Sequence, residues 1–70
     1  MEEKKNKTIG DEIKAWRKKR GITQDTLAKK ADIPYTTLAK IESGVIENPS
    51  IKTVVKIANG LNISLDDLVK

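Results

Sequence analysis

The stretch that decides the fold is TQDTLAKKADIPYTTLAKIES, residues 23–43. On both sides of its middle, apolar residues recur at the spacing of a helix: Leu27, Ala28, Ala31, Leu38 and Ile41. Between the two runs stand Asp32, which tolerates a left-handed backbone, and Pro34, which disfavours helix just before it and can begin a new helix. The segment therefore predicts two short helices, over 24–31 and 35–43, joined by a tight turn.

Three further helical segments surround this pair, and each has a start signal of its own. Thr8, Ser50 and Ser64 carry hydroxyl groups that can cap a helix at its first turn, and Gly21 and Asn62 are residues that commonly end one. The chain is therefore expected to be all-α, with residues 1–7 as a flexible basic arm and residues 8–70 as a single compact five-helix bundle. The three further helices are expected over 9–20, 51–61 and 65–69.

The composition narrows the classes of function. The 70 residues include neither Cys nor His, which excludes thiolate and histidine sites, so we expect no metal site and no cofactor. No apolar run reaches the roughly 18 residues of a membrane span, and the lysine-rich N-terminus lacks the apolar core of a secretory signal. We expect a soluble cytoplasmic protein. An enzyme is disfavoured, because carboxylates occur only at helix caps and no glycine-rich phosphate loop is present.

The positive charge is unevenly distributed. Ten lysines and arginines stand against six acids in residues 1–35, whereas residues 36–70 hold four of each. A one-sided basic excess is typical of surfaces that bind polyanions, although charge alone fits a merely solvated face equally well.

The helix expected over 35–43 has an outer face that suits DNA. Two short helices with a tight turn form the unit that places one helix in the major groove. With Leu38 and Ile41 facing inward, a rotation of about 100° per residue leaves these residues at the surface: Thr36 and Ser43 directly outward, Ala39 and Lys40 beside them, and Tyr35 and Thr37 at the edges. Ala39 could meet a thymine methyl group, and Lys40 could reach a guanine or a phosphate. No Arg, Asn or Gln lies there, so phosphate contacts and DNA shape should carry much of the binding.

From Ile9 to Leu68 the chain resembles the phage-repressor/Cro-like helix-turn-helix family, also called XRE-like. The resemblance implies a lambda-repressor-like domain of five helices that is usually dimeric, binds operator DNA and most often represses transcription. It is carried by IGDEIK at 9–14, RKKRGITQ at 17–24, LA at 27–28, IESG at 41–44, NPS at 48–50, IA at 57–58 and SLDDL at 64–68.

The resemblance also implies roles for individual residues. Arg17 and Glu42 match a structural ion pair, and Gln24 matches a glutamine that meets a phosphate and braces the reading helix. Thr23 and Ser43 lie where backbone contacts are made, and base reading falls to Tyr35, Thr36, Thr37 and Lys40, with Ala39 added from the helical wheel. Lys18 and Lys19 either contact phosphates or end the first helix as solvated charges.

Two departures from the family pattern bear on the structure. Gly60 stands where alanine is common and should fray the fourth helix. The loop Val45-Ile46-Glu47 is acidic and apolar where the family is often basic, which puts backbone contacts by this loop in doubt.

Two kinds of partner remain open. The first is double-stranded DNA bound by a weak homodimer on a palindromic operator. The second is a protein, bound by an antitoxin-like or adaptor module of the same fold. Either partner surface is expected to use Val45, Ile46, Leu65 and Leu68.

Overall fold

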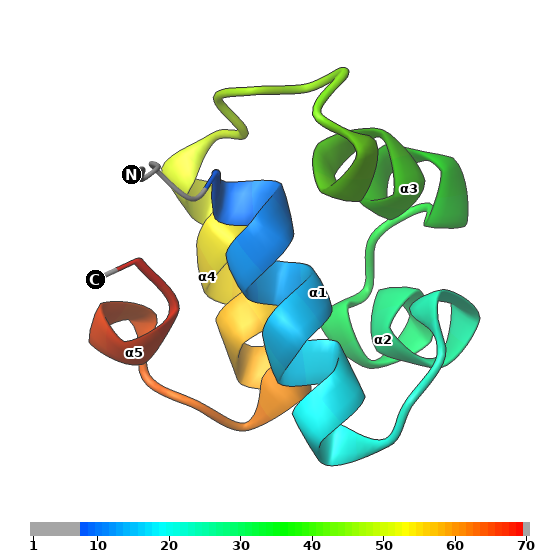
Figure 1. Ribbon diagram of the computed structural model, residues 1–70, viewed down its shortest axis with the longest axis vertical. Coiled ribbons are helices and arrows are strands. Elements are labelled where there is room, and N and C mark those ends of the chain that lie inside the picture. The colour runs from blue at the N-terminus through cyan, green and yellow to red at the C-terminus, as the bar shows by residue number, and fades with distance from the viewer. Residues whose placement is uncertain (1–7, 70) are drawn as a thin grey trace, which may run out of the picture.

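Five α-helices make up residues 8–69, the part of the chain that the computed structural model describes (Figure 1). They are α1 (Ile9–Arg20), α2 (Gln24–Ala31), α3 (Tyr35–Ser43), α4 (Ile51–Leu61) and α5 (Leu65–Val69). Within this range there is no strand, which confirms the all-α fold class, and no helix is long and apolar enough to cross a membrane. The basic arm expected over residues 1–7 lies outside the described residues.

The helix starts follow from hydroxyl side chains. The Thr8 hydroxyl accepts the Asp11 backbone N–H at 3.1 Å, and the Asp11 carboxylate accepts the Thr8 N–H at 3.2 Å, which forms the expected capping box of α1. Thr23 and Ser50 cap α2 and α4 in the same way through the backbone N–H three residues later. α3 starts at Pro34 without a side-chain cap.

The turn between α2 and α3 depends on a left-handed residue. Asp32 has φ 58° and ψ 48°, and the N–H of the next residue, Ile33, donates to the Ala28 carbonyl at 3.0 Å. This is the hydrogen-bond pattern of a Schellman ending. The turn from α4 to α5 repeats it, because Asn62 has φ 60° and the Ile63 N–H donates to the Ala58 carbonyl at 3.0 Å.

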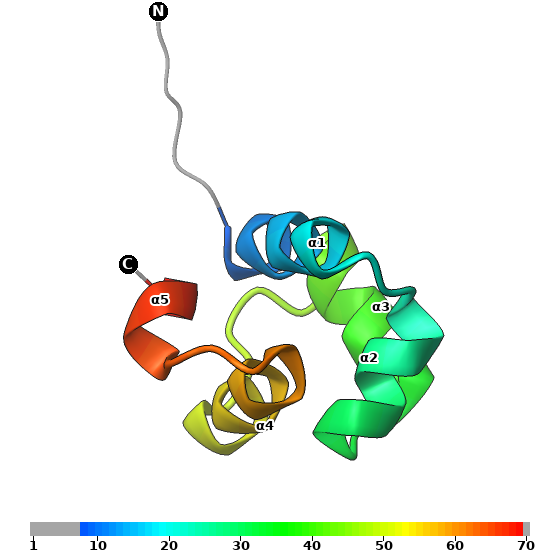
Figure 2. The ribbon, with the colours of Figure 1, turned by 90° about the horizontal axis from the view of Figure 1, so that it is seen from below.

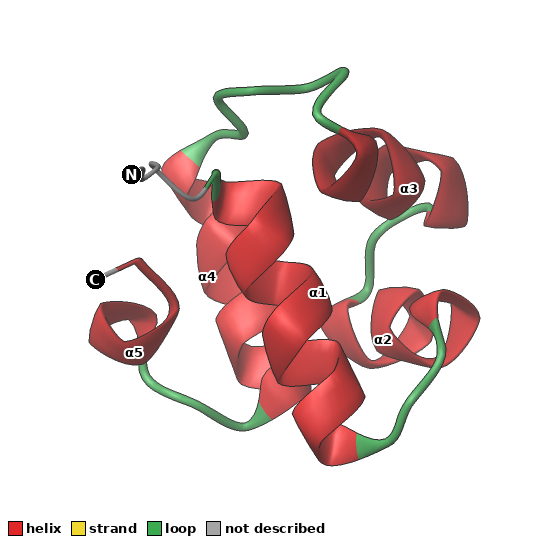
Figure 3. Ribbon diagram, in the orientation of Figure 1, coloured by secondary structure: helices red, strands yellow, loops and turns green. Residues whose placement is uncertain are grey.

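The core lies where all five helices meet. Viewed from below in Figure 2, α1 and α4 lie one above the other, with α5 on one side and the α2–α3 pair on the other. Figure 3 shows that the longest connection is the loop between α3 and α4, residues 44–50. The buried apolar side chains come from every helix: Ile13, Leu27, Ala28, Ala31, Leu38, Ile41, Val54, Ile57, Ala58, Leu61 and Leu68.

Two helical glycines allow the helices to approach closely. A Cβ atom at Gly10 would overlap the Ile41 carbonyl oxygen and lie 3.0 Å from the Glu42 Cα atom, so α1 packs directly on the backbone of α3. A Cβ atom at Gly60 would lie 3.0 Å from the Ala31 backbone nitrogen. α4 ends at Leu61, as expected from the sequence, and Gly60 has a packing role that helix propensity does not show: the missing side chain lets α4 pack on the end of α2.

We expect Gly10→Ala to destabilise the protein. In an exposed helix this change stabilises, but here the added methyl group must push α1 away from α3, which should cost about 1–3 kcal/mol. The measurement is urea unfolding followed by circular dichroism. Ala15→Gly, at an exposed position of α1, is the control and should lose only about 1 kcal/mol through helix propensity. A Gly10→Ala variant more stable than the wild type would contradict the close contact.

Candidate nucleic-acid interface

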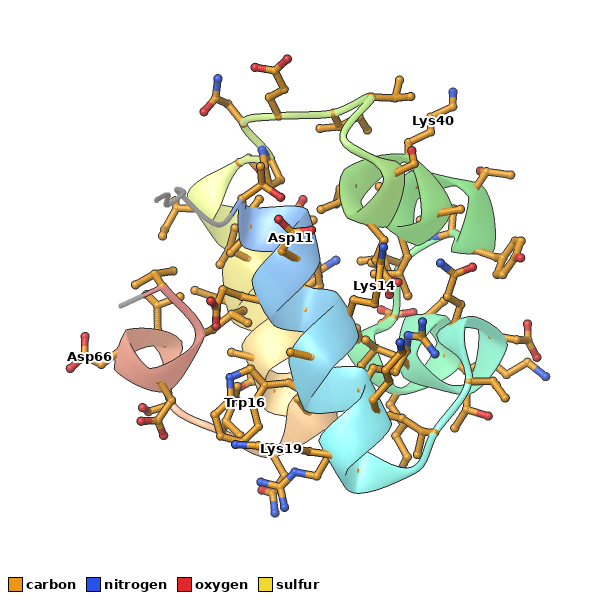
Figure 4. The ribbon with its side chains drawn as sticks, in the orientation of Figure 1. Asp11, Lys14, Trp16, Lys19, Lys40 and Asp66 are labelled. Atoms are coloured by element: carbon orange, nitrogen blue, oxygen red, sulfur yellow. The ribbon has the colours of Figure 1, made fainter. Side chains whose placement is uncertain are left out.

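α3 presents a polar outer face above an apolar inner one. Leu38 and Ile41 are buried in the core. Thr36, Lys40 and Ser43 are exposed, half of the Tyr35 surface is exposed, and Thr37 and Ala39 are half-buried at the margins. In Figure 4 the Lys40 side chain extends away from the body of the protein. The residues expected to read bases therefore share one accessible surface.

A buried carboxylate holds α3 in place. Glu42 is 4% exposed, and its two oxygens accept hydrogen bonds from Arg17 Nε and Arg17 Nη2, each at 3.0 Å. Its Oε1 atom also accepts from Gln24 Nε2 at 3.1 Å. A third nitrogen of Arg17, Nη1, donates to the Ile22 carbonyl at 3.2 Å. One carboxylate thus connects α1, α2 and α3, and the bidentate geometry fixes direction as well as distance.

The polar groups expected to contact phosphates are partly engaged within the protein. The Thr23 hydroxyl donates to Thr26 Oγ1 at 3.0 Å, and the Ser43 hydroxyl donates to the Lys40 carbonyl at 3.1 Å. One N–H of the Gln24 amide is used by Glu42. A hydroxyl has a single proton to donate, so Thr23 and Ser43 would have to break these bonds before donating to a phosphate.

The basic residues of α1 point in different directions. The Lys19 Nζ atom lies 4.8 Å from the centre of the Trp16 ring, and the Arg20 guanidinium carbon lies 5.7 Å from it. Arg20 Nη2 also donates to the Asn62 carbonyl at 3.4 Å. In Figure 4, Trp16 and Lys19 lie on the side of α1 away from α3, whereas Lys14 lies on the side toward it. The structure thus separates Lys19 from the outer face of α3.

The partner surface expected from Val45, Ile46, Leu65 and Leu68 needs correction at one residue. Leu68 is completely buried, so its side chain packs in the core and is not available to a partner, whereas Leu65 and Ile46 are half-buried against the core. Of the four residues expected there, Val45 is the one that is well exposed, at 72%. The apolar side chains that α4 and α5 do expose are Ile51, Val55 and Val69.

Comparison with known families agrees with this architecture. Residues 13–68 match the family model described as helix-turn-helix. The chain belongs to this family, in its phage-repressor-like, or XRE-like, branch. The match spans the pair α2–α3, the Glu42 carboxylate and the two helices that follow.

Individual relatives are regulators. The chain is 42% identical over 62 residues to the immunity repressor protein of Bacillus phage phi105, a match that covers 89% of this chain and 42% of that protein. It is 36% identical over 61 residues to the HTH-type transcriptional regulator SinR of Bacillus subtilis, covering 87% of this chain and 55% of SinR. The chain therefore spans about half the length of the curated relatives that it matches.

Solved structures of SinR have the same fold. The crystal structure of SinR in complex with DNA aligns with a TM-score of 0.84 and 35% identity, over 90% of this chain and all of that chain. The structure of the complex of SinR with the SinI protein also aligns with a TM-score of 0.84, over 90% of this chain and 61% of the SinR chain.

We expect the Glu42 carboxylate to contribute strongly to the free energy of unfolding of the domain. Glu42→Gln keeps the size of the side chain but leaves the Arg17 guanidinium without its counter-charge, which should cost about 3 kcal/mol. Urea unfolding measures the loss. Glu47→Gln removes an exposed charge and serves as the control, with an expected change below about 0.5 kcal/mol. Similar losses in the two variants would show that the buried pair contributes nothing of its own.

Proposed function

We propose that this chain is a sequence-specific double-stranded DNA-binding domain of a transcriptional repressor, with α3 as the helix that enters the major groove. The observation that carries the proposal is the polar outer face of α3, which is held rigidly by Glu42 beneath it. A reading helix must keep its orientation while its outer residues meet base edges, and a bidentate ion pair to α1 supplies that constraint. The fold similarity to SinR in complex with DNA supports the same role.

The chemistry of the face indicates how the bases are read. Lys40 is the one cation on the outer face of α3 and suits guanine O6 and N7. The threonines at 36 and 37 can pair with several base edges, and Tyr35, at the start of α3, flanks them. The small, half-buried Ala39 leaves room for a thymine methyl group. None of these contacts is a bidentate amide or guanidinium contact, so we expect moderate sequence discrimination.

The first test is a selection from a random double-stranded DNA pool at moderate salt. The wild type should yield a palindromic consensus. Thr36→Ala and Lys40→Ala should each change or weaken that consensus, because each removes a proposed contact to a base edge. Lys52→Ala removes an exposed lysine of α4 and is the matched control for Lys40→Ala; it should return the wild-type consensus.

The outcomes of this selection separate the candidate functions. Salt-sensitive binding without a consensus would leave a nonspecific DNA binder and contradict the role of α3. No retention of DNA would contradict the proposal as a whole. It would favour the second candidate, a protein-interaction module, which is supported by the exposed Val45 beside the exposed Glu47 and by the relative SinR, solved in complex with SinI.

We also propose that two copies bind one palindromic site as a weak homodimer. The exposed apolar side chains Ile51 and Val55 lie one helical turn apart on α4, and Val69 ends the neighbouring α5. These few side chains bury little area, so the contact should be stable mainly when DNA holds both copies.

Analytical ultracentrifugation tests the dimer. The chain alone should sediment as a monomer at micromolar concentration, and two copies should bind each palindromic duplex. Val55→Glu places a charge in the contact and should abolish the cooperativity of binding while leaving the affinity for a single half-site unchanged. A tight dimer without DNA would contradict the proposal.

A further inference from the structure

We propose that Lys14 contacts the DNA backbone beside the site that α3 reads, and that Lys19, the more prominent candidate in the sequence, does not. The inference rests on the proposed DNA-binding function and names a residue that contacts phosphate. It follows from three observations: the direction in which α1 docks, the engagement of the other donors, and the environment of the Lys14 side chain.

The docking of α1 on α3 sets the direction of each basic side chain. Gly10 packs on the Ile41 carbonyl and Arg17 binds Glu42, so the line through these two residues faces α3. At about 100° per residue, Lys14 is rotated only about 40° from Gly10, on the solvent side of that line. Lys19 is rotated about 180° from Gly10, which agrees with its contact to the Trp16 ring at 4.8 Å. Figure 4 shows the same separation.

Three of the polar side chains expected to contact phosphates are already engaged within the protein. The hydroxyl protons of Thr23 and Ser43 are donated within the protein, and the Gln24 amide donates one of its two N–H groups to Glu42. A lysine ammonium has three donors and a full charge. Among the described residues no carboxylate pairs with Lys14 within 4.0 Å, so its charge is available to a ligand.

The position of the Lys14 stem favours such a contact. The side chain is half-buried in the seam where α1 meets α3, whereas Lys18 and Lys19 are exposed. A methylene stem that lies against the protein loses less rotational freedom when the ammonium binds. Lys14 therefore provides a partly ordered cation next to the reading helix, suited to a backbone phosphate and indifferent to the base sequence.

The salt dependence of DNA binding tests this assignment. Dissociation constants would be measured by fluorescence anisotropy at several salt concentrations, on the selected duplex and on an unrelated duplex. The variants are Lys14→Gln and Lys19→Gln, which both keep the stem and remove one charge. Each phosphate contact contributes about 0.9 to the slope of log K against log salt. Lys14→Gln should therefore reduce the slope by about 0.9 for each bound copy, and Lys19→Gln should leave it unchanged.

The effect on sequence preference distinguishes a phosphate contact from a base contact. Lys14→Gln should weaken binding to both duplexes by a similar factor, because a phosphate contact does not depend on the base sequence. Lys14→Arg keeps the charge and should restore the slope.

An unchanged slope in Lys14→Gln, or an equal loss in Lys19→Gln, would overturn the assignment while leaving the DNA-binding function intact. If Lys14→Gln fails to fold, as shown by loss of its helical circular dichroism, the test passes to Lys14→Arg. A folded Lys14→Arg with a reduced salt slope would also overturn the assignment of Lys14. Failure of the wild type to bind either duplex would overturn the proposed function itself.

Discussion

The buried carboxylate of Glu42 is the interaction on which the arrangement of the first three helices depends. A carboxylate removed from water needs its oxygens satisfied, and here the Arg17 guanidinium and the Gln24 amide supply three hydrogen bonds between 3.0 and 3.1 Å. These donors come from two different helices. The position of α3 relative to α1 and α2 is therefore specified by an interaction that is strong only in one geometry. Apolar contacts between the helices are less directional and would allow one helix to shift slightly along another.

The backbone contacts act together with this ion pair. Gly10 brings α1 against the α3 backbone at Ile41 and Glu42. The absence of a side chain at Gly10 therefore sets how close α1 lies to α3, and with it the distance between Arg17 and Glu42. Gly60 has the same effect between α4 and the end of α2. In a domain of this size, with a modest apolar core, close backbone packing compensates for the small number of large buried side chains.

Much of the fold could be predicted because its signals are local. Hydroxyl caps and left-handed terminators occur within a few residues of the boundaries that they set, and the helix limits of the described chain coincide with those expected from Thr8, Gly21 and Asp32. Features that depend on which surfaces meet could not be predicted. Helix propensity alone assigns Gly60 only a weakening of α4, whereas its missing side chain leaves the space that Ala31, far away in the sequence, occupies.

The same limitation applies to the candidate site. The outer residues of α3 could be named from periodicity, because the inward positions Leu38 and Ile41 define the face. The sequence places Leu68 among the candidates for a partner surface, but α5 packs it into the domain. The run of cations at the end of α1 makes Lys18 and Lys19 the candidates that the sequence offers, whereas the side of α1 that faces α3 is defined by the contacts of Gly10. The roles of these residues toward DNA remain predictions.

The repeated turn after α2 and after α4 has a consequence for redesign. Asp32 and Asn62 have nearly the same backbone angles and the same hydrogen bonds, so the two turns share one backbone geometry. What differs is the helix that follows. α3 begins without an acidic residue in its first turn, whereas α5 begins with Asp66 and Asp67, which would repel a phosphate backbone. A redesign of the proposed DNA specificity would therefore rewrite the outer face of α3 and leave both left-handed turns unchanged.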